Sequence, residues 1–221
     1  MKSHKPKIFI IGFNKTATRS LHHFFKQNGL PSVHWDNGRL TGCFEQNILL
    51  GKELLEDGVV VNEKVNTPGK YQDMVVFSDM TQSLGWKNPS DYYKRLDSEN
   101  PGARFILNTR DTESWVKSRM NHVCGPKQLL WQKHLSYFKL PRTQENKDVL
   151  KDIYRKIHTQ HHEDVLEYFK NRKKDLVVFD IINDRIQKVI KFLQNTYSLD
   201  AKHYGHEGKT LNGPWTDNVR G

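Results

Sequence analysis

The feature that constrains the fold most is residues 7–21, KIFIIGFNKTATRSL, where an apolar run leads through small and polar residues into an amphipathic stretch. This pattern predicts a buried strand that ends at Gly12 and a helix that begins near Thr18. Backbone amides of such a loop and helix start converge on one place, where they bind a phosphate or sulfate. Lys15 adds a positive charge. The alternative is an ordinary polar turn between a strand and a helix.

The position of Lys15 separates this loop from those that bind ATP or GTP. The triphosphate loops read G-x-x-x-x-G-K-[ST], with the Lys on the first turn of the helix. Here Lys15 comes three residues after Gly12 and precedes the small-residue stretch. The ammonium group therefore approaches an anion from a different part of the turn, which argues against a standard nucleoside triphosphate site.

A second motif lies in residues 104–118, RFILNTRDTESWVKS. An apolar strand delivers Arg110 at its carboxyl end, and Ser118 follows eight residues later on the next helix. Ligands of open α/β sheets bind beyond the carboxyl ends of the strands, so Arg110 is expected to face the same crevice as the first loop. The planar guanidinium binds phosphate in a bidentate manner. The alternative is a helix-start ion pair between Arg110 and Asp111, with Ser118 facing solvent.

Together the two motifs resemble those of sulfotransferases that use 3'-phosphoadenosine 5'-phosphosulfate (PAPS). The resemblance implies that Arg110 and Ser118 bind the 3'-phosphate. It also implies that the first loop binds the 5'-phosphosulfate through Gly12, Phe13, Asn14, Lys15, Thr16, Ala17, Thr18, Arg19 and Ser20. Ala17 stands where such loops usually have Gly, so its backbone is expected to adopt a conformation open to a Cβ.

The resemblance extends along most of the chain and is strongest to small single-domain bacterial-type sulfotransferases, while residues 18–21 are similar to carbohydrate sulfotransferases. It implies PAPS as the sulfuryl donor, 3'-phosphoadenosine 5'-phosphate (PAP) as the product, no metal, and a small-molecule or carbohydrate acceptor. Near the end of the chain, the segment around Lys209 resembles a basic loop that closes over the 3'-phosphate. A loose tail is the alternative there.

Sulfuryl transfer needs an electrophile at the leaving oxygen and a base for the acceptor hydroxyl. Lys15 is the expected electrophile. Asp79 is the first choice as base because it follows the apolar strand 74–78, although it could instead cap a helix. His34 is the rival base because an imidazole titrates near neutral pH. Asp36 could hold His34 or bind the acceptor, and the adjacent Trp35 is a second acceptor-binding candidate.

Two further groups of residues have a plainer interpretation. Trp115 can stack on adenine or pack beneath its helix, and the pattern favours packing. The spacing of His158, His161 and His162 could place them beside Glu163 on one helix face, as in a metal site. A solvated helix face is the favoured interpretation.

Apolar segments and amphipathic segments alternate along the chain, which predicts a three-layer α/β fold with a central, mostly parallel sheet, similar to P-loop proteins. Strands are expected at 7–11, 32–34, 59–62, 74–78, 104–109 and 176–180. Helices are expected at 18–28, 42–55, 89–100, 112–121, 127–138, 146–171 and 184–196. The length of 221 residues fits a single domain, residues 1–221, in which 201–221 form a lid or a loose tail.

The net charge of +10 favours anionic ligands. Basic residues are spread along the helices and not gathered in an arm, so nucleic acid is not the expected partner. With no apolar run of 18 residues and no signal-peptide pattern, the sequence predicts a cytoplasmic protein without a membrane partner. The alternatives are a kinase with a variant phosphate loop, whose Mg²⁺ would bind Asp79 or Asp180, and a non-catalytic basic protein that binds nucleotides or nucleic acid.

Overall fold

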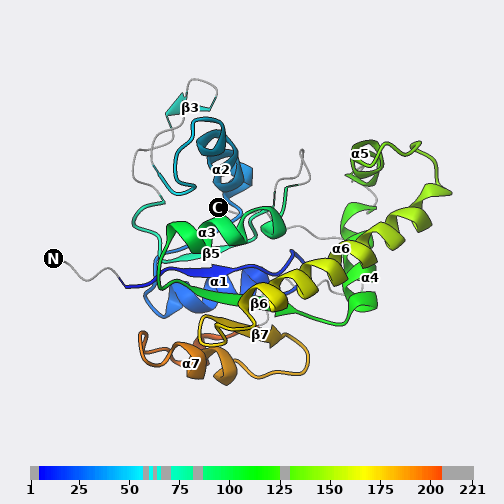
Figure 1. Ribbon diagram of the computed structural model, residues 1–221. Helices are drawn as coiled ribbons and strands as arrows, with labels where there is room; N and C mark the ends of the chain where they lie inside the picture. The colour runs from blue at the N-terminus through cyan, green and yellow to red at the C-terminus, as the bar shows by residue number, and fades with distance from the viewer. Residues whose placement is uncertain are drawn as a thin grey trace.

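A sheet of five parallel strands lies at the centre of the computed structural model, which describes residues 5–56, 60–61, 64–65, 71–81, 87–124 and 130–205 (Figure 1). Every neighbouring pair of strands is parallel. The strand order is β2 (Ser32–His34), β5 (Val76–Ser78), β1 (Ile8–Ile10), β6 (Arg104–Thr109) and β7 (Leu176–Asp180). The predicted parallel sheet is confirmed.

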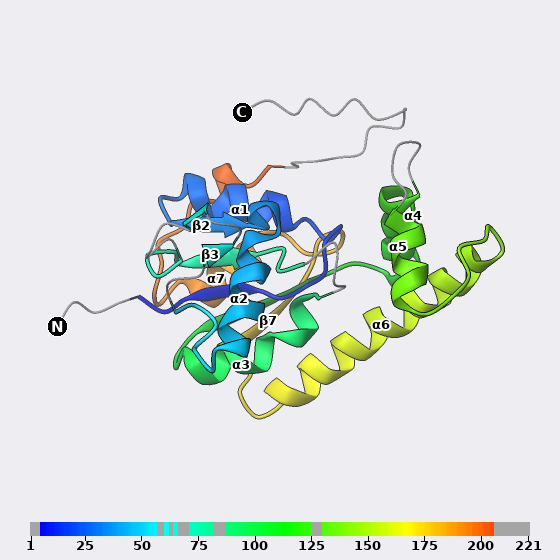
Figure 2. The ribbon, with the colours of Figure 1, turned by 90° about the horizontal axis from the view of Figure 1, so that it is seen from above.

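Helices cover both faces of this sheet (Figures 1 and 2). Alternate residues of β1 point to opposite faces. Ile8 and Ile10 pack with α1 (Thr18–Gln27) and α7 (Gln187–Leu193). Phe9 and Ile11 pack on the other face with α2 (Arg39–Leu49), α3 (Tyr93–Glu99) and the C-terminal end of α6 (Asn146–Phe169). The structure therefore has the expected three layers.

A third hydrophobic cluster lies beside the sheet, where α4 (Thr112–Val123) and α5 (Leu130–Tyr137) pack on the N-terminal half of α6. Figure 2 shows these helices standing at one end of the molecule. Trp115 is only 2% exposed and packs on Phe13 and Tyr154 in this cluster. The packing interpretation of Trp115 is confirmed.

Element bounds differ from the prediction where turns interrupt an apolar pattern. The helix expected at 42–55 begins at Arg39 and ends at Leu49, because Gly51 adopts a φ of +68° and closes a turn onto Ile48. The helix expected at 184–196 is shortened to α7 by a turn at Asp180–Asp184. The strand expected at 59–62 forms β3 (Val60–Val61), which pairs antiparallel with β4 (Lys64–Val65) outside the main sheet.

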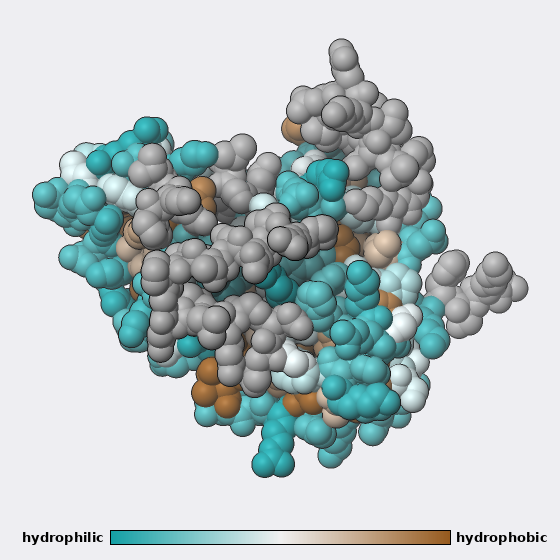
Figure 3. All heavy atoms as spheres, turned by 180° about the vertical axis from the view of Figure 1, so that it is seen from behind, coloured by the Kyte–Doolittle hydropathy of each residue, from teal (hydrophilic) through white to brown (hydrophobic). Residues whose placement is uncertain are grey.

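Three short helical turns complete the described elements. They are η1 (Asp36–Gly38), η2 (Pro89–Asp91), which replaces the first turn of the helix expected at 89–100, and η3 (Ala201–His203). No helix in the described ranges is long and apolar enough to cross a membrane. On the face shown in Figure 3, hydrophilic side chains prevail outside the grey residues, and hydrophobic ones form small separate groups.

The histidines of α6 do not lie on a solvated helix face, so that prediction was wrong. His158 and His161 are 3% and 2% exposed, and His162 is half-buried. Burial is the main cause that lowers the pKa of His158 to about 3 and of His161 to about 4. These side chains are buried because they hydrogen-bond to strand ends and to α4, partners that helical periodicity cannot reveal.

Buried neutral histidines should make the protein acid-labile. His134 in α5 is also held neutral by burial, which lowers its pKa to about 3. Below the unfolded-state pKa of about 6.5, the unfolded chain binds protons that the folded chain excludes, so each such group removes about 1.4 kcal/mol of stability per pH unit. We expect the free energy of unfolding in urea to fall by several kcal/mol between pH 7.5 and pH 5.5, and by less in His134→Phe. A free energy of unfolding that stays constant or rises on acidification would contradict this.

Candidate active site

The loop after β1 lies where the order of the strands across the sheet reverses. From β1 the chain passes through α1 to β2 on one side of the sheet, and from β6 it passes through α4–α6 to β7 on the other. Ligands of open parallel sheets bind in the crevice at the carboxyl ends of the strands where the connections diverge. The loop after Gly12 and Arg110 therefore lie at the carboxyl ends of two neighbouring parallel strands, β1 and β6.

The side chain of Asn108 in β6 fixes the shape of the loop. Its Oδ1 accepts a hydrogen bond from Gly12 N at 2.8 Å, and its Nδ2 donates to Thr16 O and Thr16 Oγ1, each at 2.7 Å. A Cβ at Gly12 would lie 1.9 Å from the backbone oxygen of Asn108. Asn108 was not among the predicted site residues, although a single amide residue after the apolar run of this strand was an available signal.

The loop contains two non-glycine residues in the left-handed region. Lys15 has a φ of 70° and Ala17 has a φ of 61°. The expectation that Ala17 avoids this region was wrong, and its conformation costs about 1 kcal/mol relative to a right-handed one. Ala17 has no side-chain oxygen with which to cap α1. The N-terminus of this helix, with its partial positive charge, therefore takes no cap from that residue and suits an anion.

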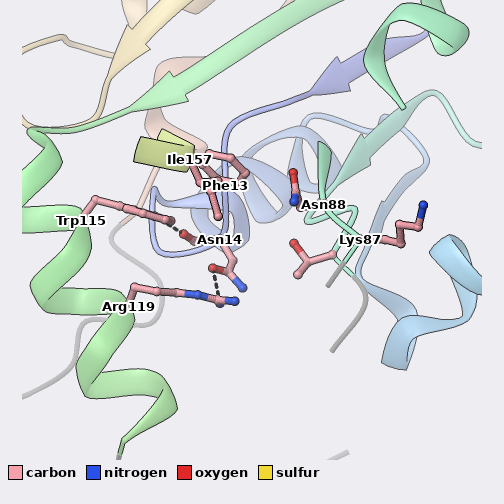
Figure 4. A pocket seen from close by; sticks show the side chains of 8 residues that line it. Phe13, Asn14, Lys87, Asn88, Trp115, Arg119 and Ile157 are labelled. Carbon is pink, nitrogen blue, oxygen red and sulfur yellow. Dashed lines mark hydrogen bonds between the residues drawn. The ribbon is translucent and has the colours of Figure 1, made fainter. Parts of the chain in front are cut away.

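The helix α4 holds the other side of the loop (Figure 4). Trp115 Nε1 donates to Asn14 O at 2.9 Å, and Arg119 Nη1 donates to Asn14 Oδ1 at 2.6 Å. Figure 4 shows both side chains reaching toward Asn14 from one helix. They line a recess with Phe13, Asn14, Thr81, Lys87, Asn88 and Ile157. Arg119 was also missed, although it directly follows the predicted Ser118.

Several cations converge near this loop. The pKa of His122 on α4 is lowered to about 4, first by burial and then by the charges of Lys15, Arg119 and Arg19. Burial alone would lower this pKa, and the added effect of the three charges shows that Lys15, Arg119 and Arg19 lie near the imidazole. The loop, the start of α1 and these side chains thus gather positive charge in one place, which suits a multiply charged anion.

Arg110 lies at the carboxyl end of β6, directly before α4. Its Nε is buried and donates no hydrogen bond to any residue that the structure describes. Asp111 is the N-cap of α4 and accepts from Ser114 N at 2.9 Å, the interaction that chiefly lowers its pKa. Ser118 is half-buried on the same helix. A guanidinium whose buried Nε has unused donor capacity suits a phosphate.

His34 and Asp79, the two alternative bases, lie side by side. The register pairs His34 of β2 with Ser78 of β5, so Asp79 follows at the adjacent strand end. His34 Nε2 is 3.5 Å from Asp79 Oδ2 and 3.2 Å from Thr18 Oγ1 at the start of α1. Burial lowers the pKa of His34, and the Asp79 carboxylate opposes that shift. The lowered pKa favours a neutral imidazole, which lies next to the Asp79 carboxylate and to Thr18 at the end of the loop after Gly12.

Asp36 has other partners. Its carboxylate accepts from Tyr71 Oη at 2.6 Å and from Arg39 Nη2 at 2.9 Å. The carboxylate placed beside His34 is that of Asp79. Trp35 and Asp36 have φ values of 52° and 49°, so the chain makes a left-handed turn directly after β2. Trp35 is half-buried in that turn.

Asp180, the other carboxylate considered for Mg²⁺, has partners of its own. The carboxylate of Asp180 at the end of β7 accepts from Ile182 N, Asn183 N and Asn183 Nδ2. It therefore closes its own turn, which disfavours the Mg²⁺ role considered for a kinase. Lys209 lies outside the described residues.

The contact between Gly12 and Asn108 predicts a strong effect of one methyl group. Gly12→Ala should lower the free energy of unfolding by about 3 kcal/mol or more, because its Cβ would overlap a backbone atom that cannot move freely. Gly42→Ala is the control, since a Cβ there meets nothing within 4 Å and a helix gains about 0.5–1 kcal/mol from Ala. Urea unfolding of both variants checks this, and equal stability of the two would be inconsistent with the close contact.

Comparison with known proteins agrees with this geometry. A family model described as "Sulfotransferase domain" matches residues 7–207 of this chain of 221 residues. The match includes both loops and all five strands of the central sheet. No curated protein matches the chain. The family match covers most of the sequence, and the chain therefore belongs to the sulfotransferase domain family.

Proposed function

We propose that this protein transfers the sulfuryl group of PAPS to a hydroxyl group, or less favourably an amine, of a small-molecule or carbohydrate acceptor. The observation that carries the proposal is the convergence of two anion-binding elements at the carboxyl ends of β1 and β6. One is the loop that is hydrogen-bonded to Asn108. The other is Arg110, whose buried Nε donates no hydrogen bond to any described residue. A nucleotide with separate 5' and 3' anionic groups matches such a pair.

The chain's own residues fit this donor. Backbone amides of residues 12–20 and the start of α1 would hold the 5'-phosphosulfate, and Lys15 would neutralise the charge that develops on the leaving phosphate oxygen. Arg110 and Ser118 would hold the 3'-phosphate. PAPS, when bound, supplies an activated sulfuryl group. Contact of Lys209 with the nucleotide stays a prediction.

For the base we propose His34, with Asp79 as its charge partner. The imidazole is neutral because of its burial, and its Nε2 faces Thr18 at the anion loop. In the transfer step, Nε2 would take the proton of the acceptor hydroxyl as the acceptor oxygen bonds to sulfur. The bond between sulfur and the 5'-phosphate oxygen would break at the same time, and PAP would leave with the negative charge that Lys15 neutralises. The nearby Asp79 carboxylate stabilises the imidazolium that forms. Trp35, in the turn after His34, is the proposed contact for the acceptor.

Binding of the reaction product tests the donor site without knowledge of the acceptor. Calorimetric titration should give PAP binding that requires the 3'-phosphate, with adenosine 5'-phosphate as the comparison. Arg110→Ala should weaken PAP binding about 10- to 100-fold, the effect of losing a charged hydrogen-bond pair. Arg104→Ala is the matched control, because Arg104 lies at the opposite end of the same strand and pairs with Asp175. Its affinity for PAP should stay close to that of the wild type.

Other outcomes of this titration have distinct meanings. Tighter binding of Mg-ATP than of PAP would indicate the kinase instead. Salt-sensitive binding of DNA or RNA duplexes, with no PAP binding, would indicate the nucleic-acid alternative. Equal PAP affinity of the Arg110 and Arg104 variants would remove Arg110 from the nucleotide site.

The pH dependence of transfer tests the base. The rate should rise with pH and level off once His34 is neutral, which occurs below its ordinary pKa. His34→Gln should lower the rate about 10²–10⁴-fold and leave PAP affinity intact. Asp79→Asn removes the charge that raises the pKa of His34, so the acidic limb should move to lower pH. Lys15→Ala should lower the rate at every pH without moving the acidic limb of the pH–rate profile. If that limb does not move in Asp79→Asn, Asp79 is not the charge partner of His34.

A further inference from the structure

We propose that His158, His161 and His162 of α6 are positioning residues. They would hold two segments at a fixed separation: residues 12–17 after β1, the first segment, and residues 110–114 after β6, the second segment. Each imidazole contacts the backbone or side chain of a residue in or next to one segment. This proposal rests on the proposed function, since it concerns the same nucleotide site. It assigns to a single helix the role of joining the end of β1 to the end of β6.

His161 holds the first segment. Its Nε2 donates to the carbonyl oxygen of Ile11 at 2.8 Å, and its ring packs on Phe13 with centroids 4.7 Å apart. These residues flank Gly12. The other nitrogen, Nδ1, is buried without a hydrogen-bond partner among the described residues. A proton there would be an unpaired buried charge, so the imidazole stays neutral and the tautomer is fixed with hydrogen on Nε2.

His162 holds the second segment. Its Nδ1 donates to His158 O at 2.7 Å, which leaves Nε2 of the neutral ring as an acceptor. Nε2 lies 2.6 Å from Thr109 Oγ1, so the hydroxyl donates to it. Thr109 directly precedes Arg110. The orientation of the strand end that carries Arg110 is thereby tied to α6.

His158 links the two segments. Its Nδ1 lies 3.1 Å from Thr112 Oγ1, at the first residue of α4, on the far side of Arg110 from Thr109. Its ring stacks on Trp115 with centroids 4.8 Å apart, and Trp115 donates to Asn14 O in the first loop. One helix therefore contacts the start of the first loop directly, reaches Asn14 through Trp115, and contacts the residues on both sides of Arg110.

The arrangement has a functional consequence because a nucleotide has a fixed span between its 5' and 3' groups. Binding both groups at once requires the two segments to be held in advance at the matching distance, since ordering them on binding lowers the affinity. Polar contacts to three neutral imidazoles fix that distance more tightly than apolar packing would. Their loss should weaken nucleotide binding more than it weakens the fold.

The test compares variants of His161 with a matched buried histidine. His161→Phe keeps an aromatic ring against Phe13 but loses the donor to Ile11, and His161→Gln keeps a donor at the position of Nε2. His134→Phe is the control: His134 is also buried, and its ring pairs with Tyr154 Oη in the cluster of α4, α5 and α6 beside the sheet. The readouts are PAP affinity, urea unfolding and backbone hydrogen exchange of residues 12–17 and 110–114 in the unliganded protein.

We expect His161→Phe to weaken PAP binding about tenfold, the equivalent of one lost hydrogen bond, while His161→Gln and His134→Phe stay within about threefold of the wild type. Exchange in both segments should accelerate in His161→Phe only. A second pair, His162→Phe and Thr109→Val, should give a double variant no weaker in PAP binding than either single one, because both remove the same contact.

Failure of this proposal and failure of the proposed function give different results. If the wild type does not bind PAP, the proposed function is wrong, and hydrogen exchange alone decides the role of the histidines. If the wild type binds PAP but His161→Phe and His134→Phe lower affinity and protection equally, the histidines are merely structural and the proposal is overturned. Additive effects of His162→Phe and Thr109→Val would overturn the contact with the second segment.

Discussion

The site depends on the side chain of Asn108, which ties the loop after β1 to the neighbouring strand. A buried amide with all three of these hydrogen bonds satisfied is rigid, and leaving its partners unpaired would cost about 1–3 kcal/mol for each. Because the amide sits on β6, these bonds tie the loop to the strand whose end carries Arg110. Gly12 allows this approach, and the left-handed residues Lys15 and Ala17 complete the turn.

Much of the fold follows from local sequence. The strands at 104–109 and 176–180 have the predicted bounds, because each contains a short apolar run. The strand at 32–34 also has the predicted bounds, with Val33 as its one buried residue. The end of α2 and the late start of α7 were not predicted, since a glycine turn and an aspartate turn interrupt patterns that remain apolar. Likewise the burial of His161 depends on the carbonyl of Ile11, a residue 150 positions away in the chain.

The candidate site, like the fold, could be predicted from the sequence only in part. Lys15 and Arg110 could be identified because their motifs are contiguous, and the topology places both at one edge of the sheet. Asn108 and Arg119 were missed because their roles exist only through contacts between β6, α4 and the loop. Whether His34 or Asp79 faces the loop could not be decided from sequence, and the register of β2 with β5 brings both together.

The place of β2 in the sheet has a further consequence. This strand of three residues lies at the edge and pairs only with β5, whereas β1 and β6 lie inside the sheet with neighbours on both sides. Edge elements with few hydrogen bonds open at lower free energy than central ones. A partial opening that releases β2 would therefore carry His34 away and leave the loop after Gly12 and Arg110 in place. The proposed base would be lost in such an opening, whereas the two segments proposed to bind the donor would be kept.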